Sequence, residues 1–232
     1  MTLAVTRPDG RVYRVGYEPD PWAWTPWEYG PFAGRWDDPE DLYRVVYAGS
    51  SPFGCFLEVL AVFRPDAALV AEFDAIEGDA EDEDFPTIPA GRVDRVWLAP
   101  RRLGGADLSG DYVDVAHSQT IAELRPGFLA RAMHYGLVDV DAAALRLAAP
   151  RAFTQEVSRF LYAGSLPSGE APAGIAFGSR HGDDQQLWAI FERDADLGAP
   201  RSRWITDDDS VPIAEDHPDL IAAMALHHLE WT

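Results

Sequence analysis

Apolar and polar residues alternate along several short stretches of the chain, and this spacing is typical of half-buried β-strands. Residues 11–17 and 43–49 are rich in β-branched and aromatic side chains, and residues 68–73 and 95–99 have the same character. Residues 174–192 fit two strands joined by a polar turn. The pattern therefore predicts a strand in each of these segments.

Elsewhere apolar residues recur at the spacing of a helix, three and four positions apart. Ser50 or Ser51, followed by Pro52, is typical of a helix start. Pro126 lies inside a helical pattern and is expected to bend or split that helix. His227 and His228 are expected at a solvated helix end. Helices are predicted over residues 52–63, 118–136, 141–150, 150–164 and 218–231.

Strands and helices alternate irregularly, which indicates an α+β domain with one mixed sheet and flanking helices rather than a parallel sheet. We expect this domain over residues 1–197, with its core at about 10–195, and an acidic extension over 198–232 that ends in a short helix. The proline- and tryptophan-rich segment 18–34 is an ordered loop, more suited to plugging the core than to lining a ligand cleft. Residues 78–91 are acidic and contain proline, so we expect a solvated loop there.

Charge and composition narrow the classes of function. The 232-residue chain has a net charge of −20, which disfavours binding to nucleic acid and to acidic membranes. All of its basic residues are arginines, so a mechanism that needs a lysine is excluded. One cysteine, no apolar leader and no apolar run of about 18 residues fit a cytoplasmic protein without a membrane span.

Glu58 is the one carboxylate in an otherwise apolar helix pattern. Its neighbours three and four positions away are small or apolar, so no partner lies within the helix. A buried, unpaired carboxylate costs several kcal/mol or gives up its charge. Glu58 therefore either reaches a backbone group or an arginine of another element, or faces a cleft and handles positive charge or a sugar hydroxyl.

Other residues are candidates for the same site. Arg14 on the first strand and Arg35 after the aromatic loop can form bidentate bonds to carboxylates or phosphates. Tyr47 lies at the end of the strand that leads into the helix of Glu58. Each can equally well serve the core or an ion pair. A weaker alternative is a serine hydrolase that uses Ser179 and His181.

Taken together, these segments resemble the RES-domain family, which is named for an arginine, a glutamate and a serine. The motifs are YRVGY, GRWDDP, VVYAG, FLEVL and GIAFGSRHG, in that order, and PRAFTQEVSRFLY resembles the helix before the last motif in longer members. Each motif is weak alone, but their order is specific, and together they span residues 10–195.

The resemblance implies a fold similar to ADP-ribosyltransferases of the diphtheria-toxin type. It also implies an enzyme that consumes NAD+ by phosphorolysis or hydrolysis or by ADP-ribosylation of a protein, as the toxin of a toxin–antitoxin pair or a toxin-like relative. By motif position, Glu58, Arg35 and Tyr47 are the expected catalytic residues, and Arg14, Arg35, Tyr47 and Ser179 bind the substrate. The partners implied are NAD+ and a helix-turn-helix-type antitoxin, with a homodimer as the default assembly.

Cleavage of the nicotinamide–ribose bond passes through an oxocarbenium-like transition state, which a carboxylate such as Glu58 stabilises. The reaction needs neither a metal nor a further cofactor. Asp37 follows the G-R-W motif where many members have Asn or Ser, and together with Asp38 it adds negative charge near the expected pyrophosphate site. The alternative is therefore a non-catalytic binding module on the same fold. The sequence leaves the acceptor of the ADP-ribose open among phosphate, water and protein.

Overall fold

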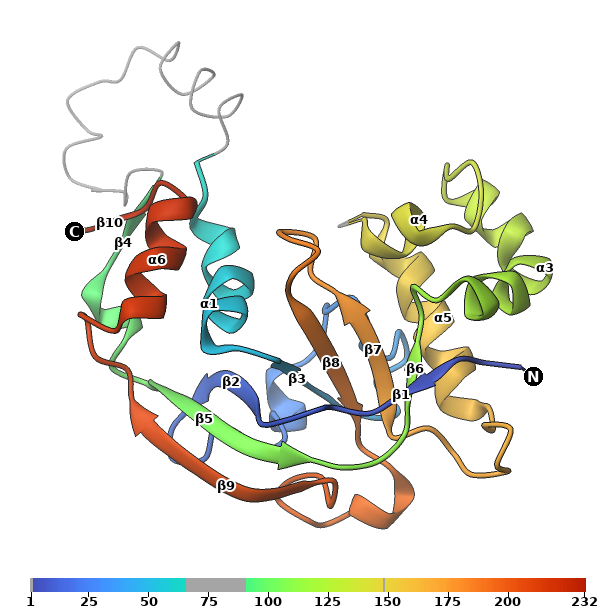
Figure 1. Ribbon diagram of the computed structural model, residues 1–232, viewed down its shortest axis with the longest axis horizontal. Helices are drawn as coiled ribbons and strands as arrows, with labels where there is room; N and C mark the ends of the chain where they lie inside the picture. The colour runs from blue at the N-terminus through green and yellow to red at the C-terminus, as the bar shows by residue number, and fades with distance from the viewer. Residues whose placement is uncertain (1, 66–90, 148) are drawn as a thin grey trace, which may run out of the picture.

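The computed structural model describes residues 2–65, 91–147 and 149–232, and its backbone forms a curled mixed sheet with helices packed on it (Figure 1). The fold belongs to the α+β class, as the hydrophobic pattern predicts. The described helices are α1 (Pro52–Leu60), α3 (Ser118–His134), α4 (Ala142–Arg146), α5 (Arg151–Ala163) and α6 (Pro218–Leu226). The strands are β1 (Val5–Thr6), β2 (Val12–Tyr17), β3 (Val45–Gly49), β4 (Arg92–Val93), β5 (Arg101–Leu108), β6 (Tyr112–Asp114), β7 (Gly174–Gly178), β8 (Gln186–Phe191), β9 (Ile205–Pro212) and β10 (Glu230–Trp231).

The main sheet has eight strands in the order β1-β6-β7-β8-β3-β2-β5-β9. Strands β6 and β7 are parallel, and the other neighbouring pairs of this sheet are antiparallel. The fifth and sixth strands in this order, β3 and β2, share a single register pair, Tyr13 with Gly49, whereas β2 and β5 are paired from Val12 to Tyr17. The sheet therefore opens between β2 and β3, in its middle rather than at an edge.

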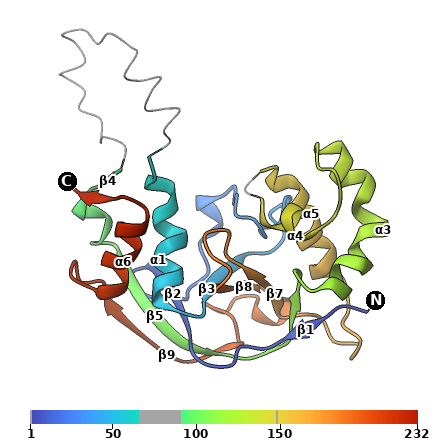
Figure 2. The ribbon, with the colours of Figure 1, turned by 45° about the horizontal axis from the view of Figure 1, so that its top comes forward.

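The helices form two groups on the sheet (Figures 1 and 2). Helices α3, α4 and α5 cover β6, β7 and β8, where Phe128, Phe153 and Ile175 share one apolar core. Helices α1 and α6 pack against each other near β2 and β5, and their apolar faces form a second core. The opening between β2 and β3 thus lies between two separately packed groups of helices.

The aromatic loop packs into a third core. Trp22 and Trp24 are buried there with Trp188 and Tyr112. Trp27, further along the loop, is partly exposed, with 44% of its surface accessible. The prediction that this loop plugs the core is therefore confirmed for Trp22 and Trp24, but not for Trp27.

The C-terminal residues belong to the same layers. Strand β9 lies beside β5 at the edge of the main sheet, and α6 packs on α1. The hydrophobic pattern missed β9 because its sequence contains three consecutive aspartates, and Asp is depleted in strands. His227 is 4% exposed and its Nε2 lies 2.8 Å from the carbonyl oxygen of Leu57, so the prediction of a solvated histidine is wrong for this residue.

Three other local predictions differ from the structure. Residues 95–99 were expected to form a strand, but Arg95–Trp97 is a 3₁₀ turn because the side chain of Asp94 caps it. Strand β5, with two glycines, was not predicted. Helix α3 runs unbroken from Ser118 to His134, so Pro126 does not split it; Pro126 is exposed, and water can reach the carbonyl that the proline leaves without a donor. The predicted strand at 68–73 and nearly all of the acidic loop at 78–91 lie outside the described residues.

None of the described helices combines the length and the apolar character that crossing a lipid bilayer requires.

We expect Gly174→Ala to destabilise the fold, because a Cβ there would collide with the backbone carbonyl of Ala189 on the neighbouring strand. The free energy of unfolding, measured by urea denaturation, should fall by about 1–3 kcal/mol. Gly127→Ala is the matched control, because nothing lies within 4 Å of a Cβ at this helical position. It should raise stability by roughly 0.5–1 kcal/mol, and equal effects of the two substitutions would contradict the packing of β7 on β8.

Candidate functional site

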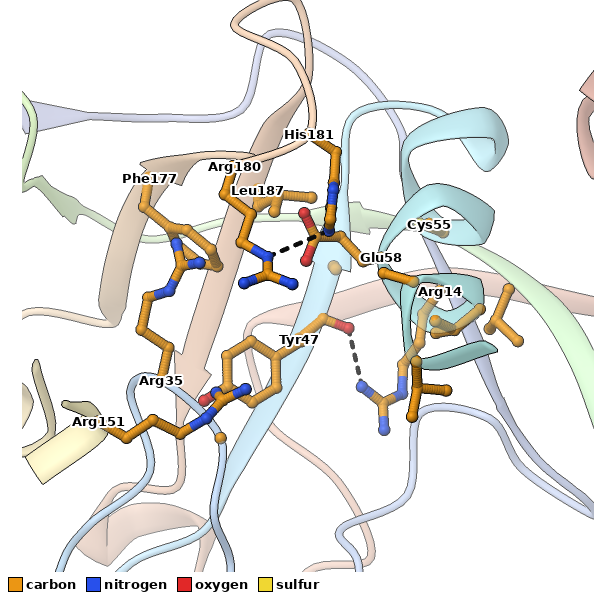
Figure 3. A pocket seen from close by; sticks show the side chains of 16 residues that line it. Arg14, Arg35, Tyr47, Cys55, Glu58, Arg151, Phe177, Arg180, His181 and Leu187 are labelled. Atoms are coloured by element: carbon orange, nitrogen blue, oxygen red, sulfur yellow. Dashed lines mark hydrogen bonds between the residues drawn. The ribbon is translucent and has the colours of Figure 1, made fainter. Parts of the chain in front are cut away.

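A cavity of about 580 Å³ lies where β2 and β3 separate (Figure 3). Its walls come from β2, β3, α1, the first residue of α5, and the turn between β7 and β8. The residues that line it are Arg14, Val15, Gly34, Arg35, Tyr47, Ala48, Cys55, Glu58, Val59, Ala61, Val62, Arg151, Phe177, Arg180, His181 and Leu187. Of the five predicted site residues, four line the cavity: Arg14, Arg35, Tyr47 and Glu58. The fifth, Ser179, does not line it but is hydrogen-bonded to Glu58.

Glu58 is half-buried on α1 and faces the cavity (Figure 3). The hydroxyl of Ser179 donates a hydrogen bond to its Oε1 at 2.5 Å. Glu58 makes no ion pair within the described part of the chain, so its partner there is a serine rather than an arginine. One carboxylate oxygen is fixed by this bond, and the group remains accessible to a ligand.

Arg35 is a buried guanidinium with no hydrogen bond or ion pair to any described residue. It is 9% exposed, and its charge lies 5.7 Å from the ring centre of Phe177. Burial lowers the pKa of Arg35, Glu58 opposes this shift, and the positive charges of Arg151 and Arg180 reinforce it. An arginine stays charged under all these influences. Arg35 is therefore a buried cation whose donors are available to an anion in the cavity.

Tyr47, which lines the cavity, is hydrogen-bonded to the buried carboxylate of Asp37. The Tyr47 hydroxyl donates to Asp37 Oδ1 at 2.8 Å and accepts from the backbone N–H of Trp36 at 2.9 Å. Asp37 Oδ2 accepts from the N–H of Gly34 at 2.5 Å. Burial raises the pKa of Asp37, and burial together with this carboxylate raises the pKa of Tyr47 well above its usual value. Neither Asp37 nor Asp38 lines the cavity.

Helix α5 holds the turn that carries Arg35. Gln155 Nε2 donates to the carbonyl of Gly34 at 3.1 Å, and the Ser158 hydroxyl donates to the carbonyl of Trp36 at 2.6 Å. A Cβ on Gly34 would lie 2.6 Å from both Asp37 Oδ2 and the Tyr47 hydroxyl, so only glycine fits there. The G-R-W and T-Q motifs thus meet in space as one unit.

Arg14 joins the two sides of the opening. Its Nη1 donates to the carbonyl of Tyr47 at 2.8 Å, and its Nε donates to the carbonyl of Pro21 at 2.7 Å (Figure 3). Burial lowers the pKa of Arg14, and nearby groups led by Cys55 and Tyr47 oppose the shift. Two of its donors therefore stabilise the walls, and Nη2 makes no hydrogen bond to the described residues.

Ser179 and His181 do not form a nucleophile–base pair. The Ser179 hydroxyl donates to Glu58 and accepts from the backbone N–H of His181 at 2.9 Å, whereas the imidazole nitrogens approach Arg64 and Arg180. This geometry argues against a serine hydrolase.

Arg151 and Arg180 were not identified from the sequence as site residues. Both are exposed and line the cavity, Arg151 as the first residue of α5 and Arg180 directly after Ser179. The sequence did contain a signal for both, because Arg151 lies in the motif PRAFTQEVSRFLY and Arg180 lies in the motif GIAFGSRHG. With Arg14 and Arg35 they give the cavity four arginines against the single carboxylate of Glu58, in a chain with a net charge of −20.

Within the described residues, no group of three or more His, Cys, Asp or Glu side chains is placed to hold a metal ion. The cavity combines a fixed carboxylate, several guanidinium groups and an apolar wall. Such an arrangement has the groups to hold an anionic organic molecule and to stabilise positive charge that develops next to the carboxylate.

Fold and site together define an α+β protein with a cationic cleft around one glutamate. The family model of the RES domain matches residues 11–125, and this part of the chain belongs to the RES-domain family. The matched range includes Arg14, Arg35, Tyr47 and Glu58. No curated protein matches the chain in sequence.

One solved structure shares the fold. It is a chain in the crystal structure of the M. tuberculosis MbcT–MbcA toxin–antitoxin complex, with a TM-score of 0.51 and 14% sequence identity. The match covers 96% of this chain and 91% of that chain, so it extends well beyond the part that matches the RES family model.

We expect Tyr47→Phe to lower stability by about 1–3 kcal/mol, because the buried Asp37 loses one of its two donors. The lost bond favours ionised Asp37, so its removal raises the folded-state pKa of Asp37 further. A raised carboxyl pKa costs stability as the pH rises. The deficit measured by urea denaturation should therefore be larger at pH 8 than at pH 5.

Tyr43→Phe is the control for this prediction. The Tyr43 hydroxyl lies 3.0 Å from the hydroxyl of Ser158, which is neutral, so its loss should cost the same at both pH values. A pH-independent deficit in Tyr47→Phe would show that Asp37 is not the group that Tyr47 stabilises.

Proposed function

We propose that this protein is an NAD+-consuming glycosyl-transfer enzyme and the toxin of a toxin–antitoxin pair. The observation that carries the proposal is Glu58, one accessible carboxylate held by Ser179 in a cavity whose other charged side chains are arginines. NAD+ presents a pyrophosphate to the arginines and a cationic glycosidic centre to the carboxylate. A cavity of about 580 Å³ is in the usual range for a ligand site.

The arginines would hold the pyrophosphate. Arg35 is buried without a partner among the described residues, and Arg151 and Arg180 are exposed and free to move onto a ligand. Bidentate bonds from guanidinium groups to phosphate are strong and directional. Arg14 would contribute only Nη2, because its other bonds support the walls.

Glu58 would act at the reacting ribose. As the bond to nicotinamide breaks, the electron pair leaves with the pyridine nitrogen, and positive charge develops on the ribose carbon and ring oxygen. A carboxylate already fixed by Ser179 stabilises that charge without reorganising. The aromatic face of Tyr47, anchored by Asp37, would orient the nicotinamide ribose beside it. The acceptor would be water, phosphate or a protein side chain.

The proposed partner is an antitoxin that covers the cleft. The RES-domain match supports a toxin, and the MbcT–MbcA structure is that of a toxin–antitoxin complex. A non-catalytic binding module is the second candidate. Its main support was the extra charge of Asp37 and Asp38, but both carboxylates bond within their own turn and neither lines the cavity.

We expect Glu58→Gln to reduce nicotinamide release from NAD+ to background, because the amide cannot stabilise a cation. Release would be followed by chromatography with purified protein, in buffers with and without phosphate. Glu123→Gln is the matched control, since Glu123 is an exposed residue of α3 outside the cavity. Full activity of Glu58→Gln would sink the assignment, and an NAD+-induced rise in melting temperature without release by wild type would favour the binding module.

Arg35→Met should weaken NAD+ binding about tenfold to a hundredfold through the loss of a charge-assisted contact. The dissociation constant would be measured by calorimetry in the Glu58→Gln background, so that NAD+ is not consumed. Arg125→Met, on the exposed side of α3, is the control and should leave affinity unchanged. Equal affinity of the Arg35 and Arg125 variants would contradict the proposed pyrophosphate site.

A further inference from the structure

His181 lines the cavity but has no part in the reaction described above. It lies in the turn between β7 and β8, two residues after Ser179, and its backbone N–H donates to the hydroxyl that holds Glu58. Its ring and the Glu58 carboxylate line the same cavity (Figure 3), and the charge of Glu58 acts on the pKa of the ring. An imidazole in this place is within reach of the atoms that react near Glu58.

The contacts of the ring require its neutral form. Nε2 of His181 lies 3.3 Å from Nε of Arg180, and Nδ1 lies 3.5 Å from Nη1 of Arg64. Guanidinium groups only donate, and an imidazolium carries a proton on both nitrogens, so it could accept from neither arginine. A neutral ring keeps one unshared electron pair and can accept from one of them.

Most groups around the ring lower its pKa and so favour the neutral form. Burial lowers the pKa of His181, Glu58 on α1 raises it, and Arg180, His227 and Arg64 lower it. Near neutral pH the ring is therefore a base with a free electron pair rather than a cation.

His227 fixes the position of this base. The two imidazole rings meet edge to face with their centres 5.4 Å apart. His227 is buried and its Nε2 lies 2.8 Å from the carbonyl oxygen of Leu57, the residue before Glu58. The base and the carboxylate are thus both tied to helix α1.

We propose that His181 is the general base that accepts the proton of a neutral acceptor, above all water; this inference rests on the proposed glycosyl transfer. The bond between the ribose carbon and the nicotinamide nitrogen breaks, and its electron pair leaves with nicotinamide. The water oxygen forms the new bond to that carbon, and one water proton passes to the unshared pair of His181. The imidazolium then releases this proton to solvent. The products are ADP-ribose, nicotinamide and a proton.

The contact between Arg180 and the His181 ring is weak enough to exchange. A distance of 3.3 Å to Arg180 is long for a hydrogen bond from N–H. Arg180 is exposed, and once its guanidinium turns to a bound phosphate, a water molecule can donate to the imidazole in its place.

The acceptor decides whether His181 is needed. Water must lose a proton as it attacks, so it requires a base. The phosphate dianion attacks through an oxygen that is already charged, so its reaction transfers no proton in this step. His181 should therefore matter for hydrolysis and be dispensable for phosphorolysis.

The test compares His181→Gln with wild type in nicotinamide release, in phosphate-free buffer and in phosphate. Hydrolysis should fall about a hundredfold, at the lower end of what general-base catalysis contributes, with KM unchanged. Phosphorolysis by the variant should stay near the wild-type rate. In wild type, hydrolysis should decline at low pH as the ring gains a proton, and this acid limb should vanish in the variant.

His134→Gln is the matched control, because His134 is an exposed histidine at the end of α3, outside the cavity. Melting temperatures of all proteins verify folding. An unchanged rate of hydrolysis in His181→Gln, equal losses with water and phosphate, or a wild type that uses phosphate but never water would each overturn the role of His181. Absence of release by wild type with either acceptor would instead overturn the proposed function, and this inference with it.

Discussion

The structure depends on how the chain stabilises an opening in the middle of its sheet. Strands β2 and β3 share one register pair, so backbone groups beyond it lack their usual partners. Leaving such a buried group unpaired costs about 1–3 kcal/mol. Arg14 replaces the missing strand partner for one of these groups by donating to the carbonyl of Tyr47, and it also ties this strand to the loop through the carbonyl of Pro21. The split therefore keeps the Tyr47 carbonyl paired where the cavity forms.

The second requirement is a buried cation with free donors, and the turn before β3 provides it. Gln155 and Ser158 of α5 donate to the backbone carbonyls on both sides of Arg35. The Tyr47–Asp37 pair bonds the backbone N–H groups of the same turn. Arg35 is fixed by bonds made to its neighbours rather than by bonds of its own guanidinium. Its donors can therefore meet a ligand with little reorganisation, which is the condition for strong electrostatic binding.

Several individual strands and helices, and much of the candidate site, could be predicted from the sequence. β2, β3, α1 and α5 follow from residue periodicity and capping, and Glu58 stood out as a lone carboxylate in an apolar helix. Its partner Ser179 is 121 positions away, so no local pattern could assign that bond. β9 was missed because its aspartates are neutralised by Arg11 and Arg201, which only the folded sheet brings near. The ADP-ribosyltransferase likeness, the domain boundary at residue 197 and the site roles stay predictions.

The charges of this protein affect an approaching anion in opposite ways at long range and inside the cavity. The net charge of −20 repels anions from afar, but at physiological salt this field is screened beyond about 8 Å. Inside the cavity the groups are closer than that, and the local sum is positive. A long polyanion meets mostly the repulsive surface, whereas a small anion that fits the cavity meets the arginines. If the cavity binds NAD+ as proposed, an acidic chain with a basic cleft would select for size as well as charge, and Glu58 would favour a positive centre within the same molecule.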